Sequence, residues 1–227
     1  MPTLDHEKAL AAAAAVSEVK SGMLVGLGTG STAAHAVREI GKRMAVGLTI
    51  RATATSLATE ALARSLNIPL VPLNDLSSLD LCIDGADEID PQLNAIKGGG
   101  GALLREKIVA SAAKRMIVIA DSSKFVQRLG KFKLPLEVLP FAAAWVERAV
   151  ADLGARVSQR RKPDSSPALT DQGNLLFDAD FGEISDPQPL ARALDSIPGL
   201  VEHGLFLSEV DAAYIARGMN VDFVARK

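Results

Sequence analysis

The side chains best suited to chemistry lie between Asp84 and Glu106. Two carboxylates, Asp84 and Asp87, come first, Lys97 follows, and a run of four glycines at 98–101 leads to Glu106. A carboxylate can remove a proton bound to carbon, and a lysine with backbone N–H groups can stabilise the oxyanion that then develops. These residue types therefore suit proton transfer next to a carbonyl group.

The glycine run favours a ligand that approaches the backbone closely. Four glycines in sequence cost conformational entropy and pack no side chain, and this run stands between a predicted strand and a predicted helix. Glu106 lies near the start of that helix, and by spacing alone it could equally be a surface glutamate paired with Arg105 or Lys107. The catalytic role of Glu106 is therefore one of two interpretations that the spacing allows.

A second loop is suited to an anion. The strand predicted at 23–27 ends in Gly28-Thr29-Gly30-Ser31-Thr32, and a helix is predicted from 33 to 44. Hydroxyl and N–H groups at a helix N-terminus bind phosphate. The loop lacks the lysine of a Walker A sequence, Ser31 replaces the third glycine of a dinucleotide fingerprint, and the next predicted strand, 48–52, has no acidic residue for a ribose. A small phosphorylated ligand is thus favoured over a dinucleotide.

Strands and helices alternate through the first part of the chain, which predicts an α/β fold with a Rossmann-like, mostly parallel sheet flanked by helices. Three predicted strands end in polar loops: GTGST after Leu27, DGAD after Ile83 and DSSK after Ala120. Ligands of open α/β sheets bind at the carboxyl ends of the strands, so we expect the three loops to converge. The other elements predicted here are helices at 5–20 (ending at Ser21-Gly22), 55–66 and 101–114, and strands at 68–72, 80–83 and 116–120.

The order of elements changes near Leu129. A β-α-β-β-α-β succession follows, which is typical of a ferredoxin-like α+β lobe. We therefore expect two units: a Rossmann-like domain formed by 1–130 and 207–227, and a smaller lobe, 131–206, inserted into it. The elements predicted for the lobe are strands at 134–139, 156–159, 174–181 and 201–206, and helices at 142–153 and 189–196.

Composition excludes several classes of protein. The 227 residues carry a net charge of −2 and no Lys/Arg cluster interleaved with aromatic residues, so no nucleic-acid partner is expected. The densest basic run, 159–162, is interpreted as a solvated loop. The single cysteine, Cys82, lies in an apolar run and is interpreted as a buried hydrophobe. Without a disulfide pair, a secretory signal or an apolar run of about 18 residues, we expect a cytoplasmic protein with no membrane partner.

A metal site is not expected either. The histidines, His6, His35 and His203, lack the HExxH spacing of a zinc site, and the acids from Asp84 to Asp90 lack the glycine and terminal glutamate of an EF-hand loop. A serine nucleophile is unsupported, because the chain contains no GxSxG sequence.

Four motifs in this order, GLGTGSTA, DGADEID, KGGGGALLREKI and DSSK, closely resemble the ribose-5-phosphate isomerase A family. The resemblance covers residues 8–140 densely, and the following lobe with GLF at 204–206 more loosely. It implies an aldose–ketose isomerase that interconverts D-ribose 5-phosphate and D-ribulose 5-phosphate through an enediolate, in the non-oxidative branch of the pentose phosphate pathway. It also implies that no cofactor is required and that the chain forms a homodimer or homotetramer.

The resemblance assigns roles to the matching residues. Glu106 matches the group that carries the proton between C1 and C2, and Lys97 matches the lysine that stabilises the enediolate. Asp84 and Asp87 match the acids that handle ring opening and hydroxyl proton transfer. The substrate-binding residues that it implies are Thr29, Gly30, Ser31 and Thr32 with Lys8 and Lys124 on the phosphate side, and Asp84, Gly85, Ala86, Asp87, Lys97, Gly98, Gly99 and Gly100 on the sugar side.

Other functions remain open on the residues alone. A non-catalytic sugar-phosphate-sensing module would use the same loops without turnover, although such a regulator normally carries a DNA-binding segment. Acyl or CoA transfer on a related scaffold would use Glu106 as a nucleophile. After GLF the chain departs from the family pattern and reads LSEVDAAYIARGMNV, so the packing of the tail and the oligomer contacts are not predicted.

Overall fold

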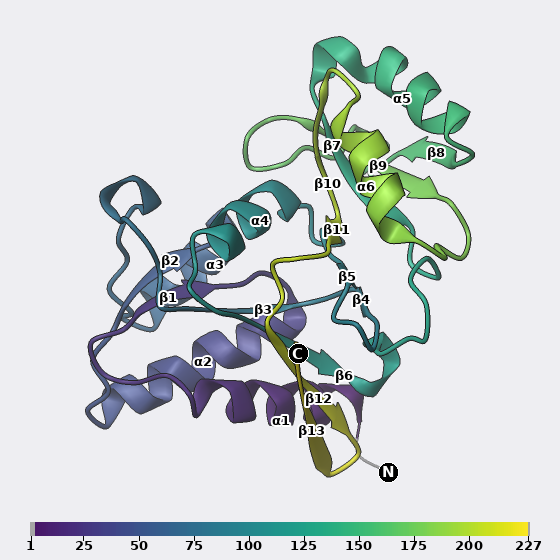
Figure 1. Ribbon diagram of the computed structural model, residues 1–227. Helices are drawn as coiled ribbons and strands as arrows, with labels where there is room; N and C mark the ends of the chain where they lie inside the picture. The colour runs from purple at the N-terminus through teal and green to yellow at the C-terminus, as the bar shows by residue number, and fades with distance from the viewer. Residues whose placement is uncertain (1–2, 227) are drawn as a thin grey trace.

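The computed structural model describes residues 3–226 and shows a larger and a smaller lobe (Figure 1). The larger lobe is built on a six-stranded sheet in the order β13-β12-β6-β3-β1-β2, in which every neighbouring pair is parallel except β12 with β13. This confirms the predicted α/β fold with a mostly parallel sheet. The strands are β1 (Leu24–Leu27), β2 (Arg51–Ala54), β3 (Leu81–Gly85), β6 (Met116–Asp121), β12 (Ala212–Arg217) and β13 (Asn220–Ala225).

Helices cover both faces of this sheet. On one face, side chains of α1 (Leu4–Val16), α2 (Ser31–Ala45) and α3 (Leu57–Ser65) share a core with the central strands. On the other face lies α4 (Leu103–Ser111), which also contacts the smaller lobe (Figure 1). The helix that carries Glu106 is therefore placed between the two lobes.

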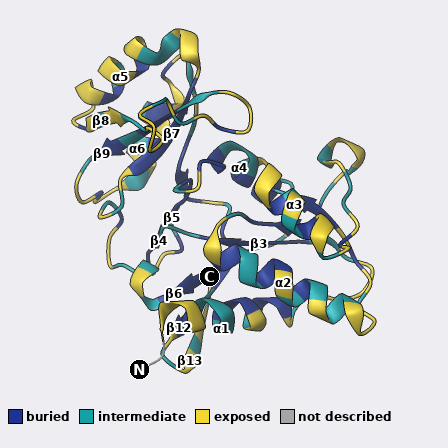
Figure 2. Ribbon diagram, turned by 180° about the vertical axis from the view of Figure 1, so that it is seen from behind, coloured by how far each residue is buried: buried dark blue, intermediate teal, exposed yellow. Residues whose placement is uncertain are grey.

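The central strands are buried on both sides, and their side chains alternate between two cores. Ile83 and Ile117 pack under α1 and α2, whereas Cys82 and Val118 pack on the side of α4. This alternation follows from the two-residue period of a strand. Figure 2 shows these strands as buried, while the outer helix turns are exposed. Cys82 is fully buried, as predicted, and burial raises the pKa of its thiol.

The strand order reverses beside β1. This strand pairs in parallel with β2 on one side and with β3 on the other. A ligand crevice forms at such a switch point, outside the carboxyl ends of the strands. The loops that follow β1, β3 and β6 all leave the sheet at this edge, which is the convergence expected from their sequences.

The smaller lobe has a four-stranded antiparallel sheet in the order β10-β7-β9-β8. Its strands and two helices alternate as β-α-β-β-α-β, and the predicted ferredoxin-like arrangement is confirmed. The elements are β7 (Leu134–Val138), α5 (Ala143–Asp152), β8 (Arg156–Gln159), β9 (Leu175–Asp180), α6 (Pro187–Asp195) and β10 (Leu200–His203), with short 3₁₀ turns at Leu73–Asp75, Ser122–Lys124 and Pro140–Ala142.

A third sheet joins the lobes and was not predicted. It contains β4 (Glu88–Ile89), β5 (Ala95–Ile96) and β11 (Leu205–Phe206), in the order β11-β5-β4. The single strand predicted at 201–206 was wrong, because the chain changes sheets at Gly204. A Cβ at Gly204 would lie 2.3 Å from the carbonyl oxygen of Lys97, so only glycine allows this approach.

Other local predictions were also wrong. The predicted strand at 68–72 makes only an isolated bridge between Leu70 and Ala52, and β2 starts later than expected. Helix α1 ends at Val16 rather than near Lys20. The Ser17 hydroxyl donates to the Ala14 carbonyl oxygen at 2.6 Å, a local bond that competes with helix continuation.

The C-terminal tail returns to the larger sheet. β12 pairs in parallel with β6, and β13 closes the edge as the second strand of a hairpin. The sequence that departs from the family pattern thus packs as a sheet edge. Within residues 3–226, no helix is both long and apolar enough to cross a membrane.

Candidate active site

A hollow of about 130 Å³ lies where the three polar loops converge. The glycine run closes one side of it, and Glu106 reaches it from α4. Asp84 is the only residue of the predicted site that does not line the hollow, because it lies buried behind the others. The lining residues are Lys8, Thr29, Gly30, Ser31, Thr32, Gly85, Ala86, Asp87, Lys97, Gly98, Gly99, Gly100, Glu106 and Lys124.

Lys97 forms the centre of a buried charged cluster. Its Nζ lies 2.9 Å from Asp84 Oδ2 and 3.4 Å from Glu106 Oε2, and it donates to the carbonyl oxygen of Gly85 at 2.6 Å. Asp84 is 0% exposed, Lys97 2% and Glu106 3%. The interpretation of Glu106 as a surface glutamate paired with its neighbours is therefore wrong.

Two buried carboxylates share one ammonium group in this cluster, and both have raised pKa values. Burial raises the pKa of Glu106 to about 8; the Lys97 ammonium opposes this rise, and the Asp84 and Asp87 charges reinforce it. Burial also raises the pKa of Asp84, against the opposing effect of Lys97. Burial disfavours the charged form of Lys97, but Asp84 and Glu106 outweigh it and raise the pKa of the ammonium. Lys97 stays charged, while Glu106 can accept and return a proton near neutral pH.

Backbone N–H groups fix Asp84 in place. Its Oδ1 accepts from Thr29 N at 2.9 Å and from Gly85 N at 2.7 Å. A Cβ at Gly28 would lie 2.1 Å from the same oxygen, so this glycine of the GTGST loop is required by the carboxylate. The close approach ties the loop after β1 to the loop after β3.

Asp87, in contrast, faces the hollow. Its Oδ2 accepts from Gly99 N at 2.7 Å, which joins the acid loop to the glycine run. The glycine run itself is a turn closed by a bond from Gly101 N to the Gly98 carbonyl oxygen at 2.9 Å. Asp87 therefore lies at the wall of the hollow, within reach of a molecule bound there, whereas Asp84 does not.

The opposite end of the hollow is built for an anion. α2 begins at Ser31, and its cap residue Gly30 supplies no side chain to the first-turn N–H groups. Lys8 Nζ donates to Ser31 Oγ at 3.1 Å, and Lys124 lines the same end. Neither lysine forms an ion pair with another residue in 3–226. Two unpaired cations at a helix N-terminus fit a phosphate group.

Three hydroxyl residues that sequence reasoning missed support this end. Thr29 Oγ1 lies 2.7 Å from Thr55 Oγ1, 2.7 Å from Ser56 Oγ and 3.3 Å from Thr59 Oγ1. Ser56 is also the cap of α3, where its Oγ accepts from Thr59 N at 3.1 Å. A serine at the start of the helix predicted at 55–66 is a common cap residue, but its contact with the GTGST loop required the fold.

Phe206 closes the buried end and was noticed in the sequence only as part of GLF. Its ring centroid lies 5.4 Å from Lys97 Nζ and 5.0 Å from Lys107 Nζ. The ring excludes water from behind Lys97 and provides a face that attracts cations.

The prediction for Arg160 was also wrong. The run 159–162 was interpreted as a solvated loop, but the Arg160 side chain is only 19% exposed. It pairs with Asp178 and donates to the carbonyl oxygens of Gly98 and Gly99. The smaller lobe thus reaches the glycine run directly.

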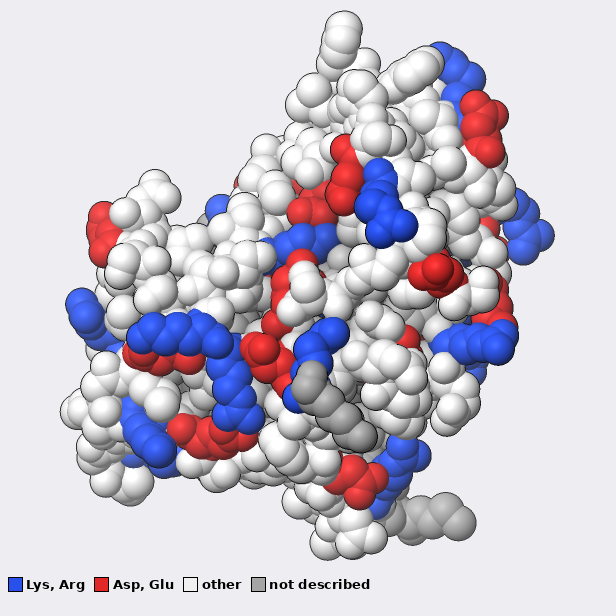
Figure 3. Space-filling model, viewed as in Figure 1, with Lys and Arg blue, Asp and Glu red and all other residues white. Residues whose placement is uncertain are grey.

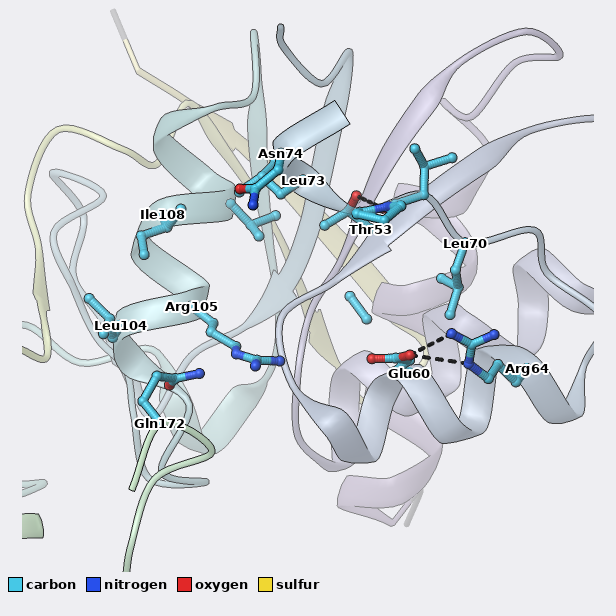
Figure 4. A pocket seen from close by; sticks show the side chains of 14 residues that line it. Thr53, Glu60, Arg64, Leu70, Leu73, Asn74, Leu104, Arg105, Ile108 and Gln172 are labelled. Atoms are coloured by element: carbon cyan, nitrogen blue, oxygen red, sulfur yellow. Dashed lines mark hydrogen bonds and ion pairs between the residues drawn. The ribbon is translucent and has the colours of Figure 1, made fainter. Parts of the chain in front are cut away.

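A larger cavity, of about 500 Å³, lies beside α4 and does not contain the charged cluster (Figure 4). Figure 4 shows Arg105 projecting into it from α4, and Glu60 with Arg64 from α3. Arg64 pairs with Glu60 at 2.6 Å, and Arg105 lies 4.0 Å from Asp171. Both arginines are matched by carboxylates within the chain, so this cavity has no excess charge for an anion.

The described residues contain no candidate metal site, and one face of the molecule has a mixed charge. Among 3–226, no three His, Cys, Asp or Glu side chains are grouped so that they could hold a metal ion. In the face shown in Figure 3, basic and acidic side chains are interspersed, and no continuous basic area appears.

A Rossmann-like α/β lobe with a small ferredoxin-like lobe, and a buried acid–lysine cluster opposite an anion site, define the class of protein. The family model for ribose 5-phosphate isomerase A (phosphoriboisomerase A) matches residues 51–220. A ribose-5-phosphate isomerase A of Sphingopyxis alaskensis is 59% identical, over 95% of this chain and 94% of the relative. The chain belongs to the ribose 5-phosphate isomerase A family.

Solved structures agree. The ribose 5-phosphate isomerase A of Methanocaldococcus jannaschii is 39% identical, with a TM-score of 0.94 over 98% of this chain and 100% of its own. A D-ribose-5-phosphate isomerase in complex with phospho-erythronic acid is 34% identical, with a TM-score of 0.96 over 99% of this chain and 100% of its own. That protein binds a phosphorylated sugar acid.

Proposed function

We propose that this protein is an aldose–ketose isomerase that interconverts D-ribose 5-phosphate and D-ribulose 5-phosphate. The observation that carries the proposal is the Glu106 carboxylate, which is buried beside Lys97 and has a pKa raised to about 8. It faces a hollow whose other end carries Lys8 and Lys124. A base and an anion site at opposite ends of one hollow suit a small phosphorylated sugar.

In this reaction, Glu106 removes the proton from C2 of the open-chain aldose. The electron pair of the C–H bond forms the C1–C2 double bond, and negative charge develops on O1. The Lys97 ammonium, held charged by Asp84, stabilises that oxygen. Glu106 then returns the proton to C1 while O2 loses its hydroxyl proton and O1 gains one, which yields the ketose.

We assign the hydroxyl and ring-opening proton transfers to Asp87. It lines the hollow, whereas Asp84 is 0% exposed and already accepts from two backbone N–H groups and pairs with Lys97. A group that cannot reach the substrate cannot exchange protons with it. Asp84 instead keeps Lys97 charged and in place.

The sugar-phosphate-sensing alternative does not account for the buried cluster. A binding module gains nothing from a desolvated carboxylate with a raised pKa, whereas a general base does. The acyl-transfer alternative needs Glu106 to attack a carbonyl carbon, and it is not supported by the family, whose members are isomerases.

Incubation of the protein with D-ribose 5-phosphate tests the proposal. We expect D-ribulose 5-phosphate to form, with solvent deuterium incorporated at C2 of recovered aldose. D-ribose without phosphate is the matched control and should be converted far more slowly. Binding of the sugar phosphate without any ketose at micromolar protein would support the sensing module and reject the isomerase.

The family also suggests a location, an oligomeric state and a cofactor requirement for this protein. We propose that the protein is a cytoplasmic homodimer or homotetramer that needs no cofactor. We also propose that 1–130 with 207–227 and the inserted segment 131–206 are separate folding units. A distinct apolar core supports this division, since it gathers side chains mainly between Leu129 and Leu207.

A further inference from the structure

The glycine run must keep one conformation if its N–H groups are to act on a reacting oxygen. We propose that Arg160 is a positioning residue: it holds the carbonyl oxygens of Gly98 and Gly99 so that the N–H groups of Gly99 and Gly100 point into the hollow. The smaller lobe thereby completes the site of the larger one. This inference rests on the proposed isomerase function.

Arg160 uses its whole guanidinium group for this contact. Nη1 donates to the Gly99 carbonyl oxygen at 2.9 Å and to the Gly98 carbonyl oxygen at 3.2 Å. Nε donates to Asp178 Oδ2 at 3.0 Å, and Nη2 donates to Asp178 Oδ1. The two side chains are 19% and 20% exposed. A bidentate carboxylate fixes the plane of the guanidinium, and one corner of that plane is aimed at the glycine carbonyls.

The peptide geometry converts this contact into a direction for the N–H groups. All peptide bonds described between residues 3 and 226 are trans, so the C=O and the N–H of each unit point to opposite sides. When Arg160 holds the Gly98 carbonyl, the Gly99 N–H points away from it, and it donates to Asp87 at 2.7 Å. When Arg160 holds the Gly99 carbonyl, the Gly100 N–H points the same way.

Gly100 is the informative member of the pair. Its N–H has no hydrogen-bond acceptor within residues 3–226, and Gly100 lines the hollow. An N–H group that is aimed at a site and has no internal partner is free to bind a developing oxyanion. Arg160 therefore provides a donor to the enediolate without touching the substrate itself.

The hydrogen bonds from Arg160 are needed because the run consists of glycines. Gly98 and Gly101 have φ values of +98° and +80°, and a run of glycines rotates its peptide units easily. Without Arg160, a flipped Gly99–Gly100 unit would present a carbonyl oxygen to the negative oxygen of the intermediate. Binding of the phosphate end would remain, but stabilisation of the transition state would decrease.

The same pair of strands offers a matched control. Arg156 pairs with Asp180 at 3.0 Å across β8 and β9, as Arg160 pairs with Asp178, but its side chain is 89% exposed. Within residues 3–226, Arg156 makes no hydrogen bond to the glycine run. A purely structural role for such an ion pair predicts similar results for Arg156 and Arg160.

Steady-state kinetics of Arg160→Gln, Arg160→Lys, Asp178→Asn and Arg156→Gln test the inference. In Arg160→Gln, we expect kcat to fall about 10- to 100-fold and KM to change less than about threefold. In Arg160→Lys, kcat should stay nearly as low, because one ammonium group cannot bind both carbonyl oxygens and Asp178. Asp178→Asn should lie in between, and Arg156→Gln should match the wild type. A fifth variant, Arg160→Ala, serves for chemical rescue: added guanidinium should restore part of its kcat, an effect that a merely structural role does not give.

Amide NMR separates this inference from the isomerase proposal. In Arg160→Lys, the Gly99 and Gly100 N–H resonances should shift and broaden whether or not the wild type isomerises the sugar. A wild type without turnover would reject the proposed function alone. Two results would overturn the role of Arg160. The first is a variant of normal thermal stability whose glycine resonances are unchanged and whose kcat is within twofold of the wild type. The second is a rise in KM at constant kcat.

Discussion

The two ends of the hollow treat charge in opposite ways. At the buried end, the Lys97 ammonium is matched within the protein by Asp84 and Glu106. At the open end, Lys8 and Lys124 have no carboxylate partner among the described residues. A charge that is paired within the protein is fixed in position and can stabilise the transition state. A charge without a partner in the protein pairs instead with the ligand and contributes to its binding. Changes at the buried end should therefore lower kcat, and changes at the open end should raise KM.

The largest effect is expected from Glu106→Gln. The amide keeps the shape and hydrogen-bonding capacity of the side chain but cannot accept the carbon-bound proton, so kcat should fall about 10³-fold, with KM nearly unchanged. Steady-state kinetics and loss of deuterium exchange at C2 measure this. Near-normal isomerisation by this variant would reject Glu106 as the base.

Lys97→Met should come next. It removes the cation from two buried carboxylates, so kcat should fall about 10²-fold and the free energy of unfolding should decrease by about 3 kcal/mol. Lys107→Met is the control, because Lys107 also lies against Phe206 but does not line the hollow. Equal losses of kcat in the two variants would mean that the lysine acts through packing.

Lys124→Ala tests the open end. Loss of one unmatched cation should raise KM about 10-fold and change kcat little, and the remaining affinity should depend less on ionic strength. The same titration with phospho-erythronic acid measures binding without turnover. A fall in kcat at constant KM would contradict the division between the two ends.

The pH dependence is a smaller but direct test of the buried end. Glu106 must be ionised to act as the base, and burial raises its pKa to about 8, so kcat/KM should increase as pH rises through this range. In Lys97→Met, the opposing positive charge is lost, and the midpoint should move to higher pH. A midpoint near pH 4.5 in the wild type would show that the carboxyl is not desolvated.

A last test concerns stability and not the reaction. The folded protein holds the Glu106 proton to about pH 8, whereas the ordinary pKa of a glutamate is 4.5. The stability linked to this proton is present below pH 4.5 and is lost as pH rises from 4.5 to about 8. Urea unfolding should thus show a smaller decline between these pH values for Glu106→Gln than for the wild type. Parallel declines would place the titrating proton elsewhere.

Local patterns predicted most of the fold and nearly all of the hollow. The period of the strands and the turn residues after Leu27, Ile83 and Ala120 are local properties, and parallel strands bring their carboxyl ends to one edge. Every lining residue except Lys8 lies in one of the four motifs, and Lys8 came only from the position of the first helix in the family. The spacing alone left the catalytic role of Glu106 open, and only the family resemblance assigned it, because a glutamate on a helix looks the same in sequence whether it faces solvent or a buried lysine.

The failures have a common cause. The strand predicted at 201–206 splits at Gly204, and Arg160 leaves its basic run to bind the glycine turn. Both depend on contacts between segments far apart in the chain. Neither hydrophobic period nor motif spacing contains information on such a contact.

The sequence by itself determined the chemical groups and the loops that carry them, because side-chain type, strand period and turn residues are local. Only the tertiary structure decided how those groups behave. It buried Glu106 and Asp84, and this burial raised their pKa values; among residues 3–226 it left Lys8 and Lys124 without a carboxylate partner. Burial and charge pairing arise when distant segments exclude water together, so they are properties of the fold and not of the motifs.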